Sequence, residues 1–385
     1  MTQTPAEAPE RRIRLTHHLV EIEDGHQVGV SVGGAGVPLV FMHGLALSRR
    51  AYLRMLSRVA GLGFLVIAID AAGHGDTRNL PGSARDLADR VELTVRALDA
   101  LGVRQAIFAG HSMGGRMAIQ LAAAAPERVL AAVLLDAAAG ASFDETAPGL
   151  LKSPRRALRT ILGAAYDAHK DPSRLQPAER GSYLRMLAAI AGRNARHPAA
   201  VAGAARAIVQ SGDYTPMLHV MRDQEIPTIV VHGEKDLVVP FDCAVDMARD
   251  ADGTLYRVPD AYHSWMIANP KQGADALRQL LRGELGEVLR HTADAVGIRS
   301  VDDAAAWERA LFEPDAVVLE LNGDVHEVGV EEPQPVQLEL VRRARRPQHT
   351  KRMPWLRRTY RRWSARHSER GRSVVRWVRP DTRAV

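Results

Sequence analysis

One serine of this chain lies in a sequence context that could make it a nucleophile. Ser112 stands between Gly110 and Gly114, directly after a buried-type apolar run and before a stretch of helical composition. A serine on a sharp turn between a strand and a helix exposes its hydroxyl, and the flanking glycines remove Cβ atoms that would collide there. The motif therefore predicts a nucleophile elbow, but Gly and Ser are common residues, so the context has to support it.

Two further residue types complete this chemistry. A serine hydroxyl is a poor nucleophile until an imidazole takes its proton, and a carboxylate must orient that imidazole. His263 follows the predicted strand 254–258, and Asp236 follows the predicted strand 228–231. Asp136 also closes a predicted strand, 131–136, and is the alternative acid. We expect Ser112 as nucleophile, His263 as base and Asp236 as the acid.

The elements that must position these residues alternate along the chain. Runs that are wholly or almost wholly apolar occur at 38–42, 64–69, 107–110, 131–136 and 228–231, and residues 254–258 predict a further strand of the same sheet. Such runs are typical of strands buried on both faces of a parallel sheet. Helical segments at 49–62, 85–101, 116–125 and 275–289 separate or follow them, which predicts a doubly wound α/β sheet. The alternating stretches 13–22 and 26–32, around Asp24-Gly25, predict a hairpin that opens the sheet.

Residues 141–223 interrupt this pattern. They form helical segments broken by prolines, with no buried strand, and predict a helical cap inserted into a core of residues 13–140 and 224–289. Residues 1–12 are expected to be disordered. The cap is rich in Ala, Leu, Ile and Met, which indicates an apolar small-molecule substrate.

The alternating strands and helices, with Ser112, Asp236 and His263 in this order along the chain, resemble the α/β-hydrolase fold. The resemblance extends from about Arg12 to Leu289 and includes His43-Gly44 and the turn Asp70 to Gly75. It implies a serine hydrolase of the esterase or lipase type, with an acyl intermediate on Ser112. C–C bond hydrolysis and acyl transfer on the same triad are alternatives. The family's usual acid loop favours Asp236.

The resemblance also implies where substrate binds. It places the oxyanion hole on the backbone N–H groups of Leu45 and Met113. The substrate pocket would include His43, Gly44, His111 and Trp265.

The composition argues against other kinds of site. The single cysteine, Cys243, excludes an intramolecular disulfide framework, and no His/Cys/Asp cluster has the spacing of metal ligands. The glycines at 33–36 precede a strand rather than a helix, so they do not predict a phosphate loop. We expect no cofactor and no metal. No apolar stretch approaches the roughly 20 residues of a membrane span, so a cytoplasmic protein is expected.

The residues that follow the core predict two additions. Alternating runs at 316–321 and 325–328 flank Asn322-Gly323, a strong hairpin signal, and 337–340 would add a third strand. A helical stretch at 301–312 completes the predicted small α+β appendage, residues 290–341.

The last segment, residues 342–385, is named here the basic tail. It holds 16 Lys and Arg against 2 acidic residues, whereas the remainder has 35 basic and 43 acidic residues. Within 355–379, tryptophans and other apolar residues fall on one helical face and arginines on the other, as in helices that lie on anionic membranes. A nucleic-acid or acidic partner and a solvated, disordered tail are alternatives, and a non-catalytic scaffold working through this tail is an alternative function. The oligomeric state is not predicted.

Overall fold

The computed structural model describes residues 10–80, 86–149, 177–323, 325–345 and 375–376. Its main sheet has the strand order β11-β9-β8-β7-β6-β4-β5-β3-β2-β12. The central strands β5, β4, β6, β7, β8 and β9 are parallel, and the outer pairs are antiparallel. This architecture confirms the predicted α/β-hydrolase fold with a mostly parallel sheet. The strand bounds are β1 Glu10–Ile13, β2 Thr16–Glu21, β3 Gln27–Gly34, β4 Val37–Met42, β5 Phe64–Ile69, β6 Ala106–His111, β7 Val129–Leu135, β8 Thr228–Gly233, β9 Thr254–Val258, β10 Glu327–Glu331, β11 Glu339–Arg342 and β12 Val375–Arg376.

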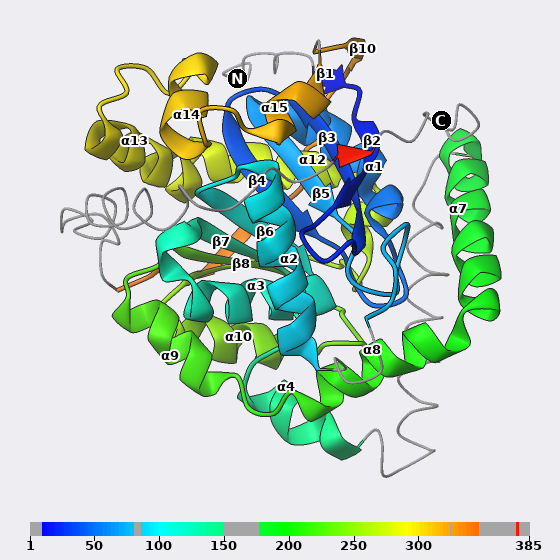
Figure 1. Ribbon diagram of the computed structural model, residues 1–385. Helices are drawn as coiled ribbons and strands as arrows, with labels where there is room; N and C mark the ends of the chain where they lie inside the picture. Colours follow the sequence, from blue (N-terminus) through cyan, green and yellow to red (C-terminus); the bar gives the residue numbers. More distant parts are fainter. Residues whose placement is uncertain (1–9, 81–85, 150–176, 324, 346–374, 377–385) are drawn as a thin grey trace.

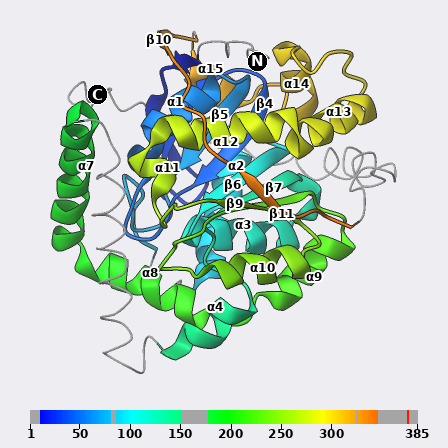
Figure 2. The same cartoon turned by 180° about the vertical axis from the view of Figure 1, so that it is seen from behind.

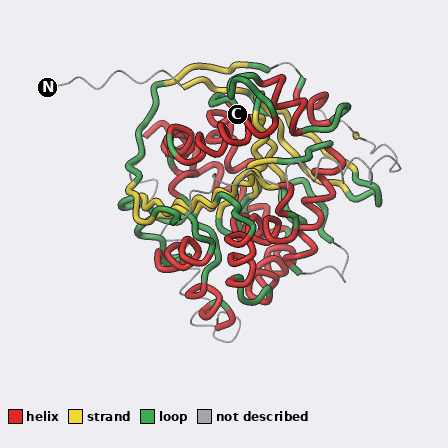
Figure 3. Tube along the Cα trace, turned by 90° about the vertical axis from the view of Figure 1, so that its left-hand side faces the viewer, coloured by secondary structure: helices red, strands yellow, loops and turns green. Residues whose placement is uncertain are grey.

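Helices cover both faces of the sheet. Figures 1 and 2 show α2, α3 and α10 on one face and α1 and α12 on the other, and in Figure 3 the strands run between layers of helices. Strands β4 to β8 are buried along their whole length, which explains their continuous apolar sequences. The helix bounds outside the cap are η1 Arg49–Tyr52, α1 Leu53–Ala60, α2 Leu87–Leu101, α3 Met113–Ala124, η2 Pro126–Arg128, α10 Phe241–Asp250, α11 Trp265–Ala268, α12 Pro270–Arg282, α13 Glu284–Val296, α14 Ala304–Leu311 and α15 Val317–Asn322.

The strand order brings the candidate site residues to one edge. β4 lies between β5 and β6, so the chain winds away from β4 in both directions. In open α/β sheets such a switch point opens a crevice at the carboxyl ends of the strands. His43 follows β4 and Ser112 follows β6 at this edge.

The described part of the cap region is helical, as predicted. It contains α4 Ala141–Thr146, α7 Pro177–Arg196, α8 Pro198–Gln210 and α9 Thr215–Asp223. In Figure 1, α4 and α8 lie along the bottom of the molecule, and α7 rises at its right. Residues 150–176 lie outside the described residues, and the division of the chain into core, cap, appendage and tail stays a prediction.

The structure corrects the predictions for both ends of the chain. Residues 316–321, predicted as the first strand of a hairpin, lie almost entirely in helix α15, Val317–Asn322, which is capped by Gly323 with a φ of 56°. The following strand, β10, pairs with β1, so the segment 10–12 is an ordered strand rather than disordered chain. β11 extends the main sheet by pairing with β9 instead of joining a separate appendage hairpin.

Little of the basic tail is described. Val375–Arg376, which the predicted amphipathic helix included, pair with β2 as strand β12. Residues 346–374 and 377–385 lie outside the described residues, and the rest of the predicted helix falls there. None of the helices in the described part of the chain combines the length and the hydrophobicity of a membrane-spanning segment.

Candidate active site

Ser112 sits on a strained turn between β6 and α3. Its φ of 54° and ψ of −116° are rarely adopted by a residue with a side chain, and such strain clusters at functional sites. Helix α3 begins at the next residue, Met113. A Cβ on Gly114 would lie 2.1 Å from the carbonyl oxygen of Met42, and one on Gly110 would lie 2.3 Å from that of Gly114. The two glycines are therefore needed for this close packing, as the motif predicted.

The predicted base and acid are hydrogen-bonded to each other. Nδ1 of His263 lies 2.7 Å from Oδ2 of Asp236, and both side chains are buried. The other carboxylate oxygen, Oδ1, accepts the backbone N–H groups of Val238 and Val239, each at 2.8 Å. These contacts fix the carboxylate so that His263 keeps its hydrogen on Nδ1 and turns Nε2 away from Asp236.

Asp136 has different partners. Its Oδ1 accepts the N–H of Gly233 at 2.7 Å, and its Oδ2 accepts the indole N–H of Trp265 at 2.8 Å. The geometry therefore places Asp236, and not Asp136, on the His263 ring. Trp265, predicted to line the pocket, is buried and uses its only polar atom on Asp136; contact with a substrate stays a prediction for it.

His111 links the Ser112 turn to the loop that carries His263. Its Nε2 donates to the backbone carbonyl of His263 at 2.8 Å, and the two rings are 4.8 Å apart between centroids. This contact brings the residue before Ser112 against the main chain of the predicted base. Segments more than 150 positions apart in the chain thus meet at one point.

The predicted oxyanion segment follows β4. The Leu45 and Met113 amides make no hydrogen bond with any described residue, which leaves them available to an oxyanion. His43 donates from Nδ1 to the Gly44 carbonyl at 2.8 Å and accepts the Ala71 N–H on Nε2 at 2.9 Å. Its ring therefore braces this segment, and a direct contact with substrate stays a prediction.

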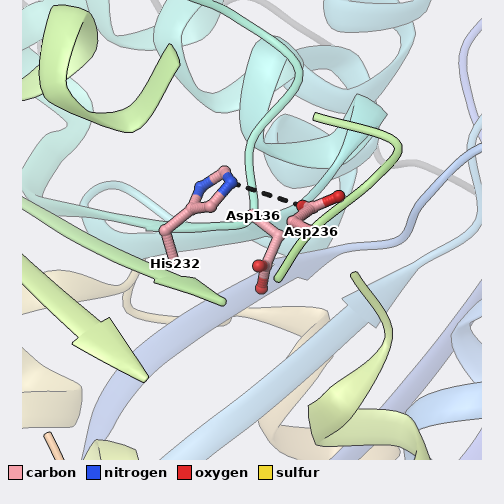
Figure 4. Close-up of side chains that lie close together, drawn as sticks. All are labelled: Asp136, His232 and Asp236. Atoms are coloured by element: carbon pink, nitrogen blue, oxygen red, sulfur yellow. Dashed lines mark ion pairs between the residues drawn. The ribbon is translucent and has the colours of Figure 1, made fainter. Parts of the chain in front are cut away.

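Two neighbouring residues were not among the predicted site residues. Tyr52 donates its hydroxyl hydrogen to His111, and His232 lies 3.3 Å from Oδ2 of Asp236 (Figure 4). In the sequence, Tyr52 was only one apolar position of the predicted helix 49–62, and His232 was only the residue that follows the predicted strand 228–231. Neither signal distinguished them from ordinary packing residues.

The buried charges around Asp236 compensate one another. Burial would lower the pKa of His232, but the Asp236 hydrogen bond and the charges of both carboxylates raise it to about 9. Burial raises the pKa of Asp136 to about 7. For Asp236, the neighbouring imidazoles outweigh burial and hold the pKa well below its usual range. For His263, Asp236 outweighs burial and raises the pKa. Asp236 is thus the carboxylate that stays ionised beside the base.

The carboxylates of Asp136 and Asp236 and the ring of His232 are groups of the kind that ligate metal ions. Among the described residues, Asp136, His232 and Asp236 form the one group whose ligand atoms lie within 4.8 Å of one another (Figure 4). All four carboxylate oxygens already accept N–H groups of the protein. Nε2 of His232 donates to the Val239 carbonyl at 2.8 Å. These donors fit an internal hydrogen-bonded network better than a metal centre, and the expectation of a metal-independent reaction stays a prediction.

Comparison with known proteins agrees with this geometry. Residues 37–270 match the family model described as alpha/beta hydrolase fold. The chain belongs to the alpha/beta hydrolase fold family. A protein of Mycobacterium phage D29, named as a non-heme haloperoxidase, is 40% identical over 273 residues, which cover 68% of this chain and 94% of the relative. A monoacylglycerol lipase of Mycolicibacterium smegmatis is 29% identical over 61% of this chain and 83% of its own length.

A solved structure gives the same result. Est816, an N-acyl homoserine lactone degrading enzyme, has a TM-score of 0.55 and 25% identity, and the match covers 68% of this chain and 99% of Est816. The relatives are esterases, lipases and other hydrolases of this fold, which confirms the prediction of a hydrolase enzyme.

Proposed function

We propose that this hydrolase cleaves a carboxylic ester through an acyl intermediate on Ser112. The observation that carries the proposal is the hydrogen bond between His263 and the ionised Asp236. The contact of His111 with the His263 carbonyl supports it, because it joins this pair to the strained turn of Ser112. A neutral imidazole held in this tautomer takes the Ser112 proton on Nε2. The role of Asp236 is to orient the ring and to stabilise the imidazolium that forms.

The reaction would take place in two steps. In the first, Ser112 Oγ attacks the ester carbonyl while His263 takes its proton, and the tetrahedral oxyanion accepts the N–H groups of Leu45 and Met113. The C–O bond to the alcohol then breaks, and His263 gives the proton to the leaving alkoxide. In the second step, His263 takes a proton from water, which attacks the acyl carbon. The bond between Oγ and the acyl carbon then breaks, and His263 returns the proton to Ser112 Oγ, which releases the acid and restores the free hydroxyl.

The cap lies against the proposed oxyanion segment and is mainly apolar on its buried side. Nδ2 of Asn194, on α7, donates to the carbonyl of Ala46 at 3.0 Å, so the cap touches the oxyanion segment directly. The buried and half-buried residues that the cap contributes to the core are mainly apolar, among them Met186, Leu187 and Ile190. Together with relatives named for a monoacylglycerol and an N-acyl lactone, this supports an ester with an apolar acyl chain.

The direct test is hydrolysis of p-nitrophenyl esters from acetyl to dodecanoyl by the full chain and by Ser112→Ala. We expect turnover by the wild type, with the highest kcat/KM for a medium or long acyl chain, and loss of turnover in the variant. Hydrolysis by Ser112→Ala at the wild-type rate would refute the proposal. Analysis of the products with an added alcohol would separate hydrolysis from acyl transfer, and a vinylogous diketone would report C–C bond hydrolysis.

The 40%-identical relative makes peroxide chemistry a second candidate. An acyl-Ser112 attacked by hydrogen peroxide in place of water would release a peracid, which can oxidise a halide. The test is bromination of a dione in acetate buffer that contains hydrogen peroxide and bromide. If this activity also disappears in Ser112→Ala, it depends on the same acyl-enzyme.

A further inference from the structure

The hydroxyl of Tyr52 lies at the centre of a buried chain of hydrogen bonds. It accepts the N–H of Gly44 at 3.1 Å and donates its own hydrogen to Nδ1 of His111 at 2.7 Å. Both side chains are 1% exposed. One hydroxyl therefore joins the oxyanion segment, after β4, to the residue that precedes the nucleophile.

The chain continues to the base. Nε2 of His111 lies 2.8 Å from the His263 carbonyl, which can only accept, so the hydrogen of the neutral ring is on Nε2 and Nδ1 is free to accept from Tyr52. Burial, with a smaller contribution from His263, lowers the pKa of His111 to about 3. The ring thus stays neutral, and the direction of each hydrogen bond stays fixed, over the working pH range of a hydrolase.

Close packing holds this chain against the oxyanion segment. A Cβ on Gly44 would lie 2.9 Å from Nδ1 of His111 and 3.3 Å from the Tyr52 oxygen. The Tyr52 ring packs on Phe41 of β4, with 4.7 Å between centroids. Any side chain at position 44 would therefore collide with the His111 ring and crowd the Tyr52 hydroxyl, so both groups lie directly against the backbone that precedes Leu45.

We propose that Tyr52 and His111 are positioning residues, which hold the oxyanion amide of Leu45, the Ser112 turn and the His263 loop at fixed distances from one another. The three segments come from different parts of the chain, and these hydrogen bonds join them through two side chains. The inference rests on the proposed function, because it assigns Leu45 to the oxyanion hole. Neither side chain is assigned a contact with substrate.

The test is Tyr52→Phe, which removes the hydroxyl and keeps the ring. Displacing an oxyanion donor should cost less than deleting one, so we expect kcat to fall by about 10- to 100-fold while KM changes by less than about threefold. The affinity of an alkyl boronic acid, which forms a tetrahedral anion on Ser112, should fall by a similar factor. The control is Tyr256→Phe, which removes a hydroxyl bonded to Glu284 of α13 and not to any of these three segments; it should leave both values unchanged.

A second measurement does not depend on turnover. Hydrogen exchange of the amides at 43–48 should become faster in Tyr52→Phe and stay unchanged in Tyr256→Phe. If exchange, kcat and boronate affinity in Tyr52→Phe all match the control, the inference is wrong. If the wild type shows no Ser112-dependent turnover but exchange at 43–48 still rises in Tyr52→Phe, the proposed function has failed and the positioning role of Tyr52 has not.

Discussion

The guanidinium carbon of Arg116 lies 3.5 Å from the centre of the Tyr214 ring. Arg116 is on the first turn of α3, next to the Ser112 elbow, whereas Tyr214 lies between α8 and α9 at the far end of the cap. Arg116 also bonds to Asp144 of α4, at the beginning of the cap, at 2.6 Å. One buried side chain thus ties both ends of the cap insertion to the nucleophile helix. Its remaining hydrogen-bond acceptors are Ser211 Oγ and the carbonyls of Ala138 and Gly212.

Arg116→Met should loosen the cap. Removing one partner of a buried ion pair typically costs about 3–5 kcal/mol, because the other charge is left unpaired. We expect a lower free energy of unfolding in urea and faster hydrogen exchange across 177–223. The control is Arg128→Met in η2, which follows α3; there the arginine pairs with Asp99. This variant should lose stability without faster exchange in the cap. Equal cap exchange in both variants would contradict the anchoring role.

Replacement by asparagine should have different effects at Asp236 and at Asp136. Asp236→Asn should lower kcat by about 10³- to 10⁴-fold, because an amide no longer holds the His263 tautomer or stabilises its imidazolium. Asp136→Asn should keep kcat within about tenfold but lose about 1–3 kcal/mol of stability, since its NH₂ group would face an N–H donor. Steady-state kinetics and urea unfolding on the same samples check both. If kcat fell more in Asp136→Asn than in Asp236→Asn, Asp136 and not Asp236 would be the acid.

The pH dependence follows from the raised pKa of His263. The base must be neutral to take the Ser112 proton, and its pKa lies above the usual 6.5 because Asp236 favours the charged ring. The value of kcat/KM should therefore rise with pH, with a midpoint above 6.5. The residual activity of Asp236→Asn should show this midpoint at lower pH, because the raising charge is gone. An unchanged midpoint in that variant would contradict the role of Asp236.

The basic tail gives a separate prediction. A chain that ends at Arg345 should fold and turn over small esters as the full chain does, but should lose co-sedimentation with vesicles of anionic phospholipid. Each basic residue near such a surface contributes about 1 kcal/mol, so the full tail should bind even at moderate salt. Binding of the full chain to duplex DNA but not to these vesicles would favour the nucleic-acid alternative instead.

The sequence predicted the parts of the fold that local patterns determine. The elbow around Ser112 was predictable because its strained turn requires the two glycines, and the buried strands were predictable because both of their faces need apolar residues. The segment 317–322 was not, because Asn322-Gly323 serves equally well in a hairpin and at a helix end. Here Asn322 donates to the Gly34 carbonyl and α15 packs on the sheet, contacts set by the folded structure alone.

The site shows the same division. Ser112, Asp236 and His263 were proposed from order and motif, and the acid loop already favoured Asp236 over Asp136; the hydrogen bond between Asp236 and His263 supports that choice. Tyr52 and its partner His111 are 59 positions apart in the sequence, and His111 and its partner His263 are 152 positions apart. A local sequence pattern cannot predict contacts between residues so far apart in the chain.

The most direct test of the central claim is labelling with a fluorophosphonate, which reacts only with an activated serine, followed by mass spectrometry of the peptide that contains residue 112. We predict a single adduct on Ser112 in the wild type, and none in Ser112→Ala or, at matched times, in His263→Ala. An unlabelled wild type that is folded, or an adduct that persists in Ser112→Ala, would contradict the claim that Ser112 is the nucleophile of this hydrolase.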